Sequence, residues 1–220
     1  ALTAKALGYK VYANDLARSC VPIWKGILEN DDITLDRMDA VRLLQPALDA
    51  PKYWRLKDLT YTRVAEICDI AMHNVKELED KKKQYLAQAA LIRYLVMASP
   101  FGSLTKQAAI RALDNGTFQL AGDDRSFQRS WLHGVTPLRA FLHVCNLVNF
   151  GVFRGLEPAE FSSMDAFEFL EKIKADTVYL DPPYYGTTPY SHQYKALEEW
   201  FGKEDPRIHR FNQENLLERL

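Results

Sequence analysis

The spacing of apolar residues changes twice along the chain, and each change predicts a different kind of element. An apolar helical face precedes Gly8, which ends the predicted helix, and a short strand follows at 10–13. From 61 to about 98, and again after Gly134, apolar residues recur every three or four positions, which predicts long helices. The run Lys81–Lys83 falls on the polar side of this pattern and predicts a solvated helix face.

After residue 165 the pattern predicts helix, strand and helix once more. An apolar helix is expected at 166–173, a strand at 177–180 and an amphipathic helix at 211–220. The strands at 10–13 and 177–180 are both short, and both lead into polar corners that helical sequence follows. We therefore expect 177–180 to be a central, buried strand that runs parallel to the strand at 10–13.

These patterns predict an α/β fold that is interrupted by helices. Residues 1–29 and 150–220 are expected to form two parts of one α/β domain, and residues 30–149 a mostly helical insert. The sequence has no initiator Met, and helical patterns run to both of its ends. We therefore expect it to be part of a longer protein.

The composition of the chain indicates which binding partners and which cellular compartment to expect. Lys and Arg total 28 and Asp and Glu 29, so a site for a polyanion is expected to be local rather than spread over the surface. Cys20, Cys68 and Cys145 are odd in number and widely spaced, which predicts buried thiols, a reducing compartment and no metal site. No stretch has the length of a membrane span and no signal-like segment opens the chain, so we expect a cytoplasmic protein.

The word Asp181-Pro182-Pro183-Tyr184 follows the predicted strand at 177–180. Aspartate and proline are common turn residues, so a plain turn is one interpretation. At average residue frequencies, however, this word occurs in a chain of this length roughly one time in a thousand. Ligands of open α/β sheets bind outside the carboxyl ends of the strands, so the position also favours a functional interpretation.

The chemistry of this corner suits an amine. The Asp181 carboxylate and the Pro182 carbonyl can each accept one hydrogen bond from an NH₂ group. An aromatic amine that donates both hydrogens moves toward a tetrahedral nitrogen and regains the lone pair that it needs to attack a methyl group. Tyr184 offers an aromatic face for a planar base that has left its helix.

The stretch "DTVYLDPPYYG" (176–186) resembles the catalytic motif of adenine-specific DNA methyltransferases, most closely the DNA adenine methylase group. The resemblance implies a Rossmann-like core, S-adenosylmethionine as cofactor and double-stranded DNA as partner. It implies transfer of a methyl group to N6 of a flipped adenine, with Asp181, Pro182, Pro183 and Tyr184 as catalytic residues. In this group a target-recognition region lies where the helical insert falls. We expect a monomer or weak dimer without a metal.

Two further aspartates match cofactor-binding positions of the group. "AKALGYKVYANDLARS" is similar to its second strand, whose terminal acidic residue, here Asp15, holds the ribose hydroxyls. Asp165, in "SSMDAFEFLEKIKAD", occupies the aspartate-containing stretch that precedes the catalytic strand. Each is equally interpreted as an ordinary helix cap. The group's Phe-x-Gly-x-Gly turn has no counterpart in this sequence and belongs, by the group's order, just before Ala1.

DNA contacts are expected in the insert. Between 101 and 140, Lys106, Arg111, Arg125 and Arg129 stand among hydroxyl and amide side chains, a mixture that suits phosphates and base edges. A mildly basic surface is the alternative. Cytosine-N4 in DNA, adenine in RNA and a glutamine side chain remain possible acceptors of the methyl group. The alternative from another class is a methylase remnant that binds nucleic acid without catalysis.

Overall fold

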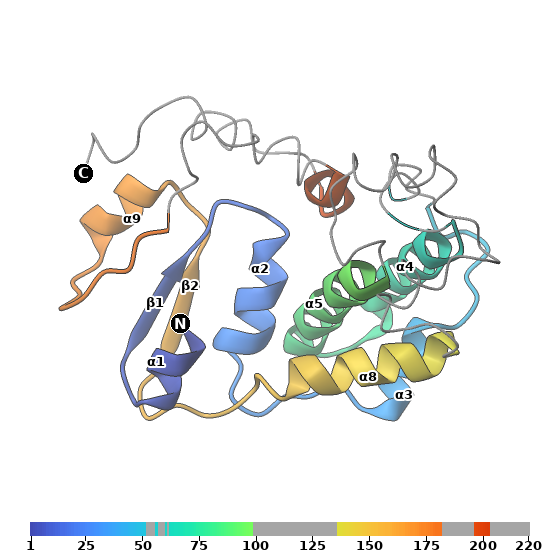
Figure 1. Ribbon diagram of the computed structural model, residues 1–220, viewed down its shortest axis with the longest axis horizontal. Coiled ribbons are helices and arrows are strands. Elements are labelled where there is room, and N and C mark those ends of the chain that lie inside the picture. The colour runs from blue at the N-terminus through green and yellow to red at the C-terminus, as the bar shows by residue number, and fades with distance from the viewer. Residues whose placement is uncertain (52–55, 57–59, 61, 99–135, 182–195, 203–220) are drawn as a thin grey trace, which may run out of the picture.

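The computed structural model describes residues 1–51, 56, 60, 62–98, 136–181 and 196–202. Within these residues a parallel sheet of β1 (Val11–Asn14) and β2 (Ala159–Ser162) stands beside a group of helices (Figure 1). The helix α2 (Cys20–Ile23) and the π-helix η1 (Trp24–Leu28) lie between the sheet and the other helices (Figure 1). The expected combination of a parallel sheet with a large helical part is confirmed at this level.

The sheet joins two segments that are far apart in the sequence. Val11 pairs with Ala159 and Asn14 with Ser162, and the strands run in the same direction. The predicted strand at 10–13 is therefore confirmed, with its bounds moved by one residue. The sequence pattern missed β2, because four residues with a single buried position, Phe161, carry almost no periodic signal.

A small core holds the sheet against η1. Val11 and Ala13 alternate inward along β1 and meet Leu28 and Phe161. The Trp24 and Phe161 rings stack with their centroids 6.3 Å apart. Because both rings are large, this contact removes much apolar surface from water and fixes η1 on the face of the sheet.

The first helix, α1 (Leu2–Ala6), ends as expected at Gly8, whose φ of 86° favours glycine. Its Lys5 side chain is only 1% exposed. The Lys5 ammonium donates to the carbonyls of Leu28 at 2.7 Å and Asn30 at 3.0 Å, and it pairs with Asp31 at 3.0 Å. These partners offset the cost of removing the ammonium group from water and attach α1 to the end of η1.

The helical part consists, among the described residues, of α3 (Arg37–Leu43), α4 (Thr62–Asn74), the 3₁₀ turn η3 (Val75–Glu77), α5 (Lys81–Ala98) and α8 (Pro137–Asn149). At its centre, α5 buries Leu86, Leu91 and Leu95 completely. The predicted helical spacing is confirmed from 62 to 98, but η3 divides it into α4 and α5. The break precedes Asp80, whose carboxylate accepts from the amides of Lys82 and Lys83 and so caps α5.

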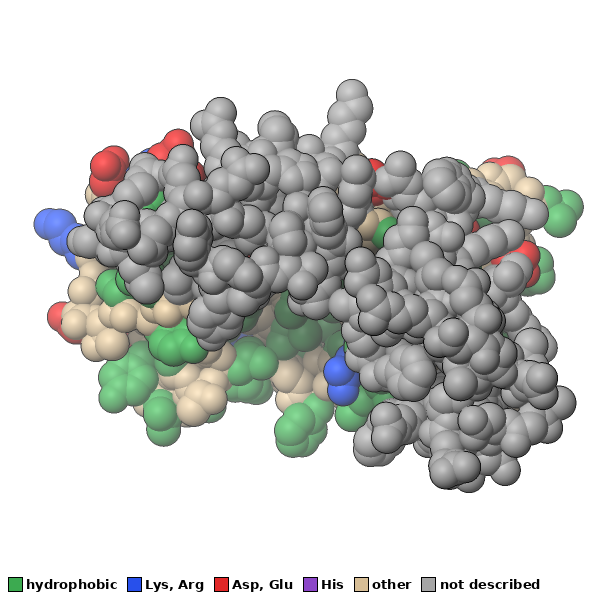
Figure 2. Space-filling view, turned by 45° about the horizontal axis from the view of Figure 1, so that its top comes forward, with side chains coloured by type: hydrophobic (Ala, Val, Ile, Leu, Met, Phe, Trp, Pro, Cys, Tyr) green, Lys and Arg blue, Asp and Glu red, His purple; other side chains and the backbone are tan. Residues whose placement is uncertain are grey.

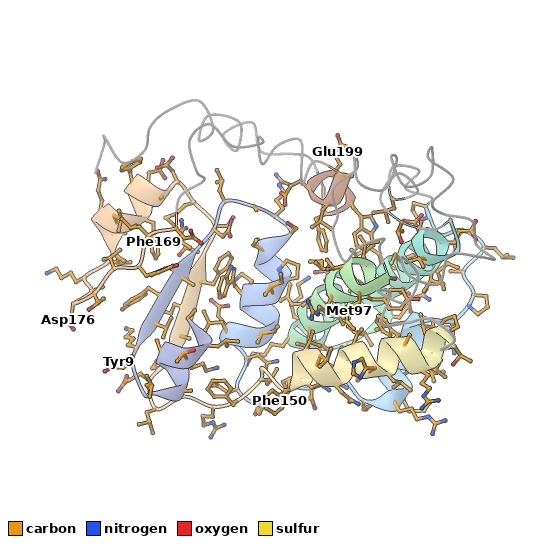
Figure 3. The ribbon with its side chains drawn as sticks, viewed as in Figure 1. Tyr9, Met97, Phe150, Phe169, Asp176 and Glu199 are labelled. Atoms are coloured by element: carbon orange, nitrogen blue, oxygen red, sulfur yellow. The ribbon has the colours of Figure 1, made fainter. Side chains whose placement is uncertain are left out.

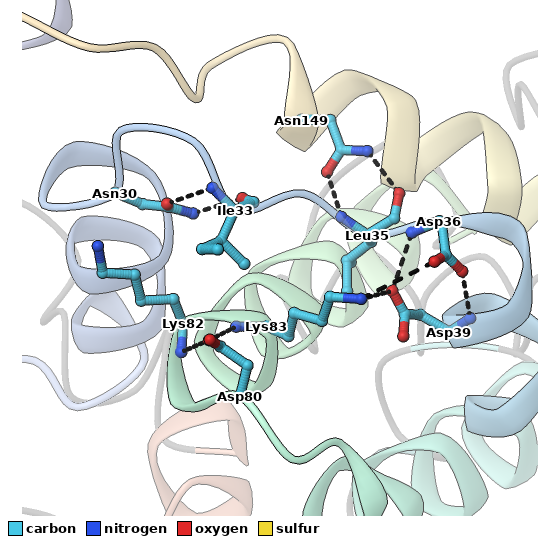
Figure 4. Close-up of polar contacts among 9 residues, drawn as sticks. All are labelled: Asn30, Ile33, Leu35, Asp36, Asp39, Asp80, Lys82, Lys83 and Asn149. Atoms are coloured by element: carbon cyan, nitrogen blue, oxygen red, sulfur yellow. Dashed lines mark hydrogen bonds and ion pairs between the residues drawn. The ribbon is translucent and has the colours of Figure 1, made fainter.

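Polar side chains connect these helices (Figure 4). Asp36 and Asp39 form a reciprocal capping box at the start of α3. Lys83 of α5 donates to Asp39 at 2.6 Å and is 27% exposed, so the prediction of a solvated helix face is wrong at this position. Asn149 exchanges two hydrogen bonds with the backbone of Leu35, which joins α8 to the segment before α3.

The thiols and the surface qualify the expectations from composition. Cys68 and Cys145 are buried as predicted, and burial raises the pKa of Cys145 to about 12, whereas Cys20 is half-buried. On the face in Figure 2, described acidic and basic side chains are scattered, with hydrophobic side chains between them. No helix in the described part of the chain combines the length and the apolar character needed to cross a bilayer.

Candidate functional site

The carboxyl ends of β1 and β2 meet at one edge of the sheet, and this edge carries polar side chains from both strands. The ladder continues one residue beyond β1, because the Asp15 amide donates to the Ser162 carbonyl at 3.2 Å. Asp15 therefore leaves the end of β1, and Met164 and Asp165 leave the end of β2. The parallel pairing thus brings the two predicted cofactor-binding aspartates to the same edge.

Asn14 joins the two strand ends directly. Its amide nitrogen donates to the Met164 carbonyl at 3.0 Å, and its amide oxygen accepts from the Met164 amide at 3.2 Å. Met164 immediately precedes Asp165. The pair of bonds consequently fixes the position of the Asp165 backbone relative to the end of β1.

Asp15 is half-buried and holds the loop that follows β1. Its Oδ1 atom accepts from the Ala17 amide at 2.9 Å, so the carboxylate closes a turn rather than capping a helix. Burial raises the pKa of Asp15, and the negative charge of Glu198 raises it further, whereas hydrogen bonds from the Ala17 amide and the Cys20 thiol oppose that rise. A carboxylate has about four acceptor positions, so Asp15 keeps acceptor capacity for a ligand hydroxyl.

Asp165 is the N-cap of α9 (Ala166–Lys172), and the predicted helix at 166–173 is thereby confirmed. The Asp165 Oδ1 atom accepts from the Phe167 amide at 2.9 Å. The cap that the sequence offered as an alternative is therefore present in the structure. A cap uses one oxygen, and the second oxygen keeps its acceptor positions.

Glu198 is the residue of this region that sequence reasoning missed. It lies in a short helix at 196–200, it is 2% exposed, and its carboxylate accepts from the amides of Arg18 at 2.8 Å and Ser19 at 3.0 Å. The Ser19 hydroxyl donates to the same carboxylate. In "ALEEWF" the order of apolar and polar residues does not distinguish Glu198 from Glu199, because only the packing of the helix decides which glutamate points inward.

The prediction for the strand at 177–180 is wrong. These residues belong to no strand, and they are exposed: Val178 by 49%, Tyr179 by 87% and Leu180 by 45%. A strand needs a neighbour for its backbone groups, and in the described residues the sheet contains β1 and β2 alone. Favourable β-propensity without such a neighbour does not make a strand.

Of the remaining predicted site residues, the structure describes Asp181 alone. Asp181 is described, and it is exposed at the end of the segment that leaves α9. Figure 3 shows Asp176 of the same segment at the outer edge of the molecule. The other predicted catalytic and DNA-binding residues lie outside the described residues: Pro182, Pro183, Tyr184, Lys106, Arg111, Arg125 and Arg129.

Two further features bear on possible ligands. In the part of the chain that the structure describes, no group of three or more His, Cys, Asp or Glu side chains is placed to hold a metal ion. A polar surface pocket of about 370 Å³ lies on the helical part, lined by Arg42, Gln45, Asn74, Glu77 and Glu79. Its mixture of charges does not favour one class of ligand, so the edge of the sheet is the better candidate site.

Comparison with known proteins supports a methyltransferase. The chain is 27% identical over 207 residues to the type II methyltransferase M2.HphI of Haemophilus parahaemolyticus, a match that covers 91% of this chain and 60% of that protein. It is 25% identical over 222 residues to the modification methylase StsI of Streptococcus sanguinis, covering 91% of this chain and 30% of that protein. The resemblance to DNA methyltransferases that the sequence predicted is confirmed.

The match covers only part of each relative. The chain spans about three fifths of the first relative and less than a third of the second. No protein-family model matches the chain, and no solved structure matches it. The similarity therefore concerns DNA methyltransferases in general and does not distinguish adenine from cytosine as the acceptor.

Proposed function

We propose that this chain, which resembles DNA modification methyltransferases, takes part in the transfer of a methyl group from S-adenosylmethionine to N6 of a flipped adenine in double-stranded DNA. The observation that carries the proposal is the similarity to two such enzymes over 91% of the chain. The Asp181-Pro182-Pro183-Tyr184 word supports the choice of an exocyclic amine as acceptor. We propose further that the sheet is part of a Rossmann-like core.

The edge of the sheet fits the ribose end of the cofactor. Asp15 lies at the carboxyl end of β1, where parallel sheets bind ligands, and it keeps acceptor positions for ribose hydroxyls. Asp165 lies at the same edge on the neighbouring strand and supplies a second carboxylate. We assign ribose binding to Asp15 and a supporting contact to Asp165.

In the chemical step, Asp181 and the Pro182 carbonyl each accept a hydrogen bond from one N–H group of the adenine amine. This arrangement localises the lone pair on nitrogen, while Tyr184 stacks on the extruded base. When bound, S-adenosylmethionine supplies a methyl group activated by a positively charged sulfur. Asp181 stabilises the positive charge that develops on the amine before its proton is lost.

Target recognition is assigned to the helical insert at 30–149. Lys106, Arg111, Arg125 and Arg129 are proposed to contact phosphates or base edges. Their charge suits a polyanion, although the whole chain is close to neutral.

The second candidate is a nucleic-acid-binding remnant without catalysis. It is favoured by the segment at 177–180, which is exposed and belongs to no strand among the residues that the structure describes. The two candidates share DNA binding and differ in methyl transfer.

The test incubates the purified protein with S-adenosylmethionine and bacterial genomic DNA that lacks base methylation, and then measures methylated nucleosides by mass spectrometry. We expect N6-methyladenine from wild type and a loss of roughly a hundredfold to a thousandfold in rate for Asp181→Ala. Asp176→Ala, an exposed aspartate of the same segment, is the matched control and should retain its activity.

Each result separates the candidates. N4-methylcytosine in place of N6-methyladenine would correct the acceptor. DNA binding without any methylated nucleoside would establish the remnant. An Asp181→Ala protein with more than half of the wild-type rate would remove Asp181 from the catalytic step.

A further inference from the structure

The short helix at 196–200 connects the helical part of the molecule to the edge of the sheet. Leu197 is 3% exposed and packs into the core of the helical group, and Trp200 and Phe201 pack against the same core. The next residue along the helix, Glu198, turns its carboxylate to the loop that follows β1. Figure 3 shows Glu199 projecting outward from this helix, away from the loop.

The Glu198 carboxylate is buried, and no lysine, arginine or histidine in the described part of the chain forms an ion pair with it. Its donors are the amides of Arg18 and Ser19 and the Ser19 hydroxyl. Burial of a carboxylate destabilises the folded state unless the carboxylate is hydrogen-bonded, and these three donors provide the hydrogen bonds. An apolar side chain would fill the same space with a smaller loss of stability, so the carboxylate is expected to have a further role.

Ser19 indicates what the carboxylate does. Ser19 is the N-cap residue of α2, and its side chain makes no capping hydrogen bond, while its hydroxyl donates to Glu198. The backbone of Ser19 is helical, with φ of −65° and ψ of −22°, whereas a serine whose side chain caps a helix usually has an extended backbone. Glu198 thus places its negative charge at the start of α2, where the helix dipole favours it.

Two carboxylates together determine the shape of this loop. Asp15 binds the amide of Ala17, and Glu198 binds the next two amides, those of Arg18 and Ser19. Three consecutive amides therefore point at two acidic side chains, one at the end of β1 and one from the far end of the chain. The bonds to Glu198 thus involve the two residues that directly follow Ala17, the residue whose amide binds Asp15.

A second contact between the same segments supports this arrangement. Gly202, just after the helix, has a φ of 138°, which only glycine adopts readily. A Cβ atom at Gly202 would lie 2.9 Å from the guanidinium of Arg18, so the glycine leaves room for that side chain. The segment at 196–202 thus meets the loop through Glu198 and again through Gly202.

We propose that Glu198 is a positioning residue for cofactor binding: it holds residues 15–19 in the shape that presents Asp15 to the ribose of S-adenosylmethionine. The inference rests on the proposed function. It also couples the helix that follows the Asp181 corner to the cofactor site, because the loop keeps its shape only while that helix is docked through Leu197.

The experiment compares Glu198→Ala and Glu198→Gln with Glu199→Gln, the neighbouring glutamate in the same helix, in the full chain. Hydrogen exchange at the Arg18 and Ser19 amides reports the loop, and calorimetry reports the affinity for S-adenosylmethionine. For Glu198→Ala we expect both amides to exchange roughly tenfold faster or more and the affinity to fall roughly tenfold, since each hydrogen bond to a charged group is lost. Glu198→Gln keeps one acceptor oxygen and should lie between Glu198→Ala and wild type, and Glu199→Gln should match wild type.

Kinetics separates positioning from general damage. A positioning role raises KM for S-adenosylmethionine and leaves kcat largely unchanged, whereas loss of folded protein lowers the apparent kcat. Ser19→Ala, which removes only one donor, provides a milder perturbation if Glu198→Ala does not fold.

Specific outcomes would overturn the proposal. Wild-type exchange at the Arg18 and Ser19 amides in Glu198→Ala, or in Glu198→Gln if Glu198→Ala does not fold, would show that the carboxylate does not hold the loop. Wild-type affinity together with faster exchange would show that the shape of the loop does not matter for the cofactor. If the wild-type chain binds no S-adenosylmethionine, the proposed function fails, and the role of Glu198 in cofactor binding fails with it, although the exchange data still report the loop.

Discussion

Replacing Asn14 by alanine removes the two hydrogen bonds that join the ends of β1 and β2. The side chain donates to the Met164 carbonyl at 3.0 Å and accepts from the Met164 amide at 3.2 Å. Alanine keeps the Cβ atom, and the change leaves the backbone pairing of Asn14 with Ser162 intact. The substitution therefore tests the side-chain bonds and little else.

The expected cost follows from these two bonds. Each contributes a net ~0.5–1.5 kcal/mol to stability, and Met164 is half-buried, so water replaces the lost partner only in part. We expect a loss of about 2 kcal/mol in the free energy of unfolding. For a chain of this size that corresponds to a fall in Tm of roughly 4–8 °C.

The measurement is thermal unfolding followed by circular dichroism, with urea unfolding as a second scale. Asn146→Ala is the matched control, because Asn146 is exposed on α8 and should change stability by less than about 0.5 kcal/mol. Asn14→Asp keeps an acceptor for the Met164 amide but turns a carboxylate toward the Met164 carbonyl. It should destabilise the protein at least as much as alanine does.

The same variant should weaken the affinity for S-adenosylmethionine, because Met164 positions Asp165 at the edge of the sheet. The reasoning is refuted if Asn14→Ala unfolds at the same temperature as Asn146→Ala. A stable Asn14→Ala protein with reduced affinity would instead assign Asn14 a direct role in binding.

Two other substitutions test the edge and the core. Burial raises the pKa of Asp15, so the folded protein holds that proton more tightly than the unfolded chain, and stability is lost as pH rises through the raised pKa. Asp15→Asn should therefore stabilise the protein against urea at pH 7, and this gain in stability should disappear near pH 4. The variant should also bind S-adenosylmethionine more weakly. A variant that is less stable than wild type at pH 7 would contradict the raised pKa of Asp15. Gly26→Ala would gain about 1 kcal/mol of helix propensity but would place a Cβ atom 2.7 Å from the Leu86 amide nitrogen of α5, an overpacking that costs roughly 1–3 kcal/mol. We expect a lower urea midpoint for Gly26→Ala than for Lys25→Ala in the same helix. An unchanged or higher midpoint for Gly26→Ala would show that η1 and α5 can move apart without loss of stability.

Local signals account for the elements that sequence reasoning placed well. Gly8 ends α1, Pro137 with Thr136 starts α8, and Asp165 caps α9, each through an interaction that spans a few residues. Such interactions are readable because both partners lie in one short stretch of sequence. The strand at 177–180 misled for the complementary reason: its residues favour a strand, but no local pattern states whether a neighbouring strand is present.

The sequence by itself determined the helical spacing, the caps, the strand at β1 and the Asp181-Pro182-Pro183-Tyr184 word that indicated methyl transfer to an amine. The tertiary structure alone decided that β1 pairs with β2, that Asn14 binds Met164 across 150 residues, and that Glu198 reaches the Arg18 amide across 180 residues. The physical reason is that a hydrogen bond between distant segments forms only after apolar packing has brought them together. Leu197 in the helical core and Phe161 beside Trp24 bring the distant segments together, and neither contact can be predicted from the neighbouring sequence.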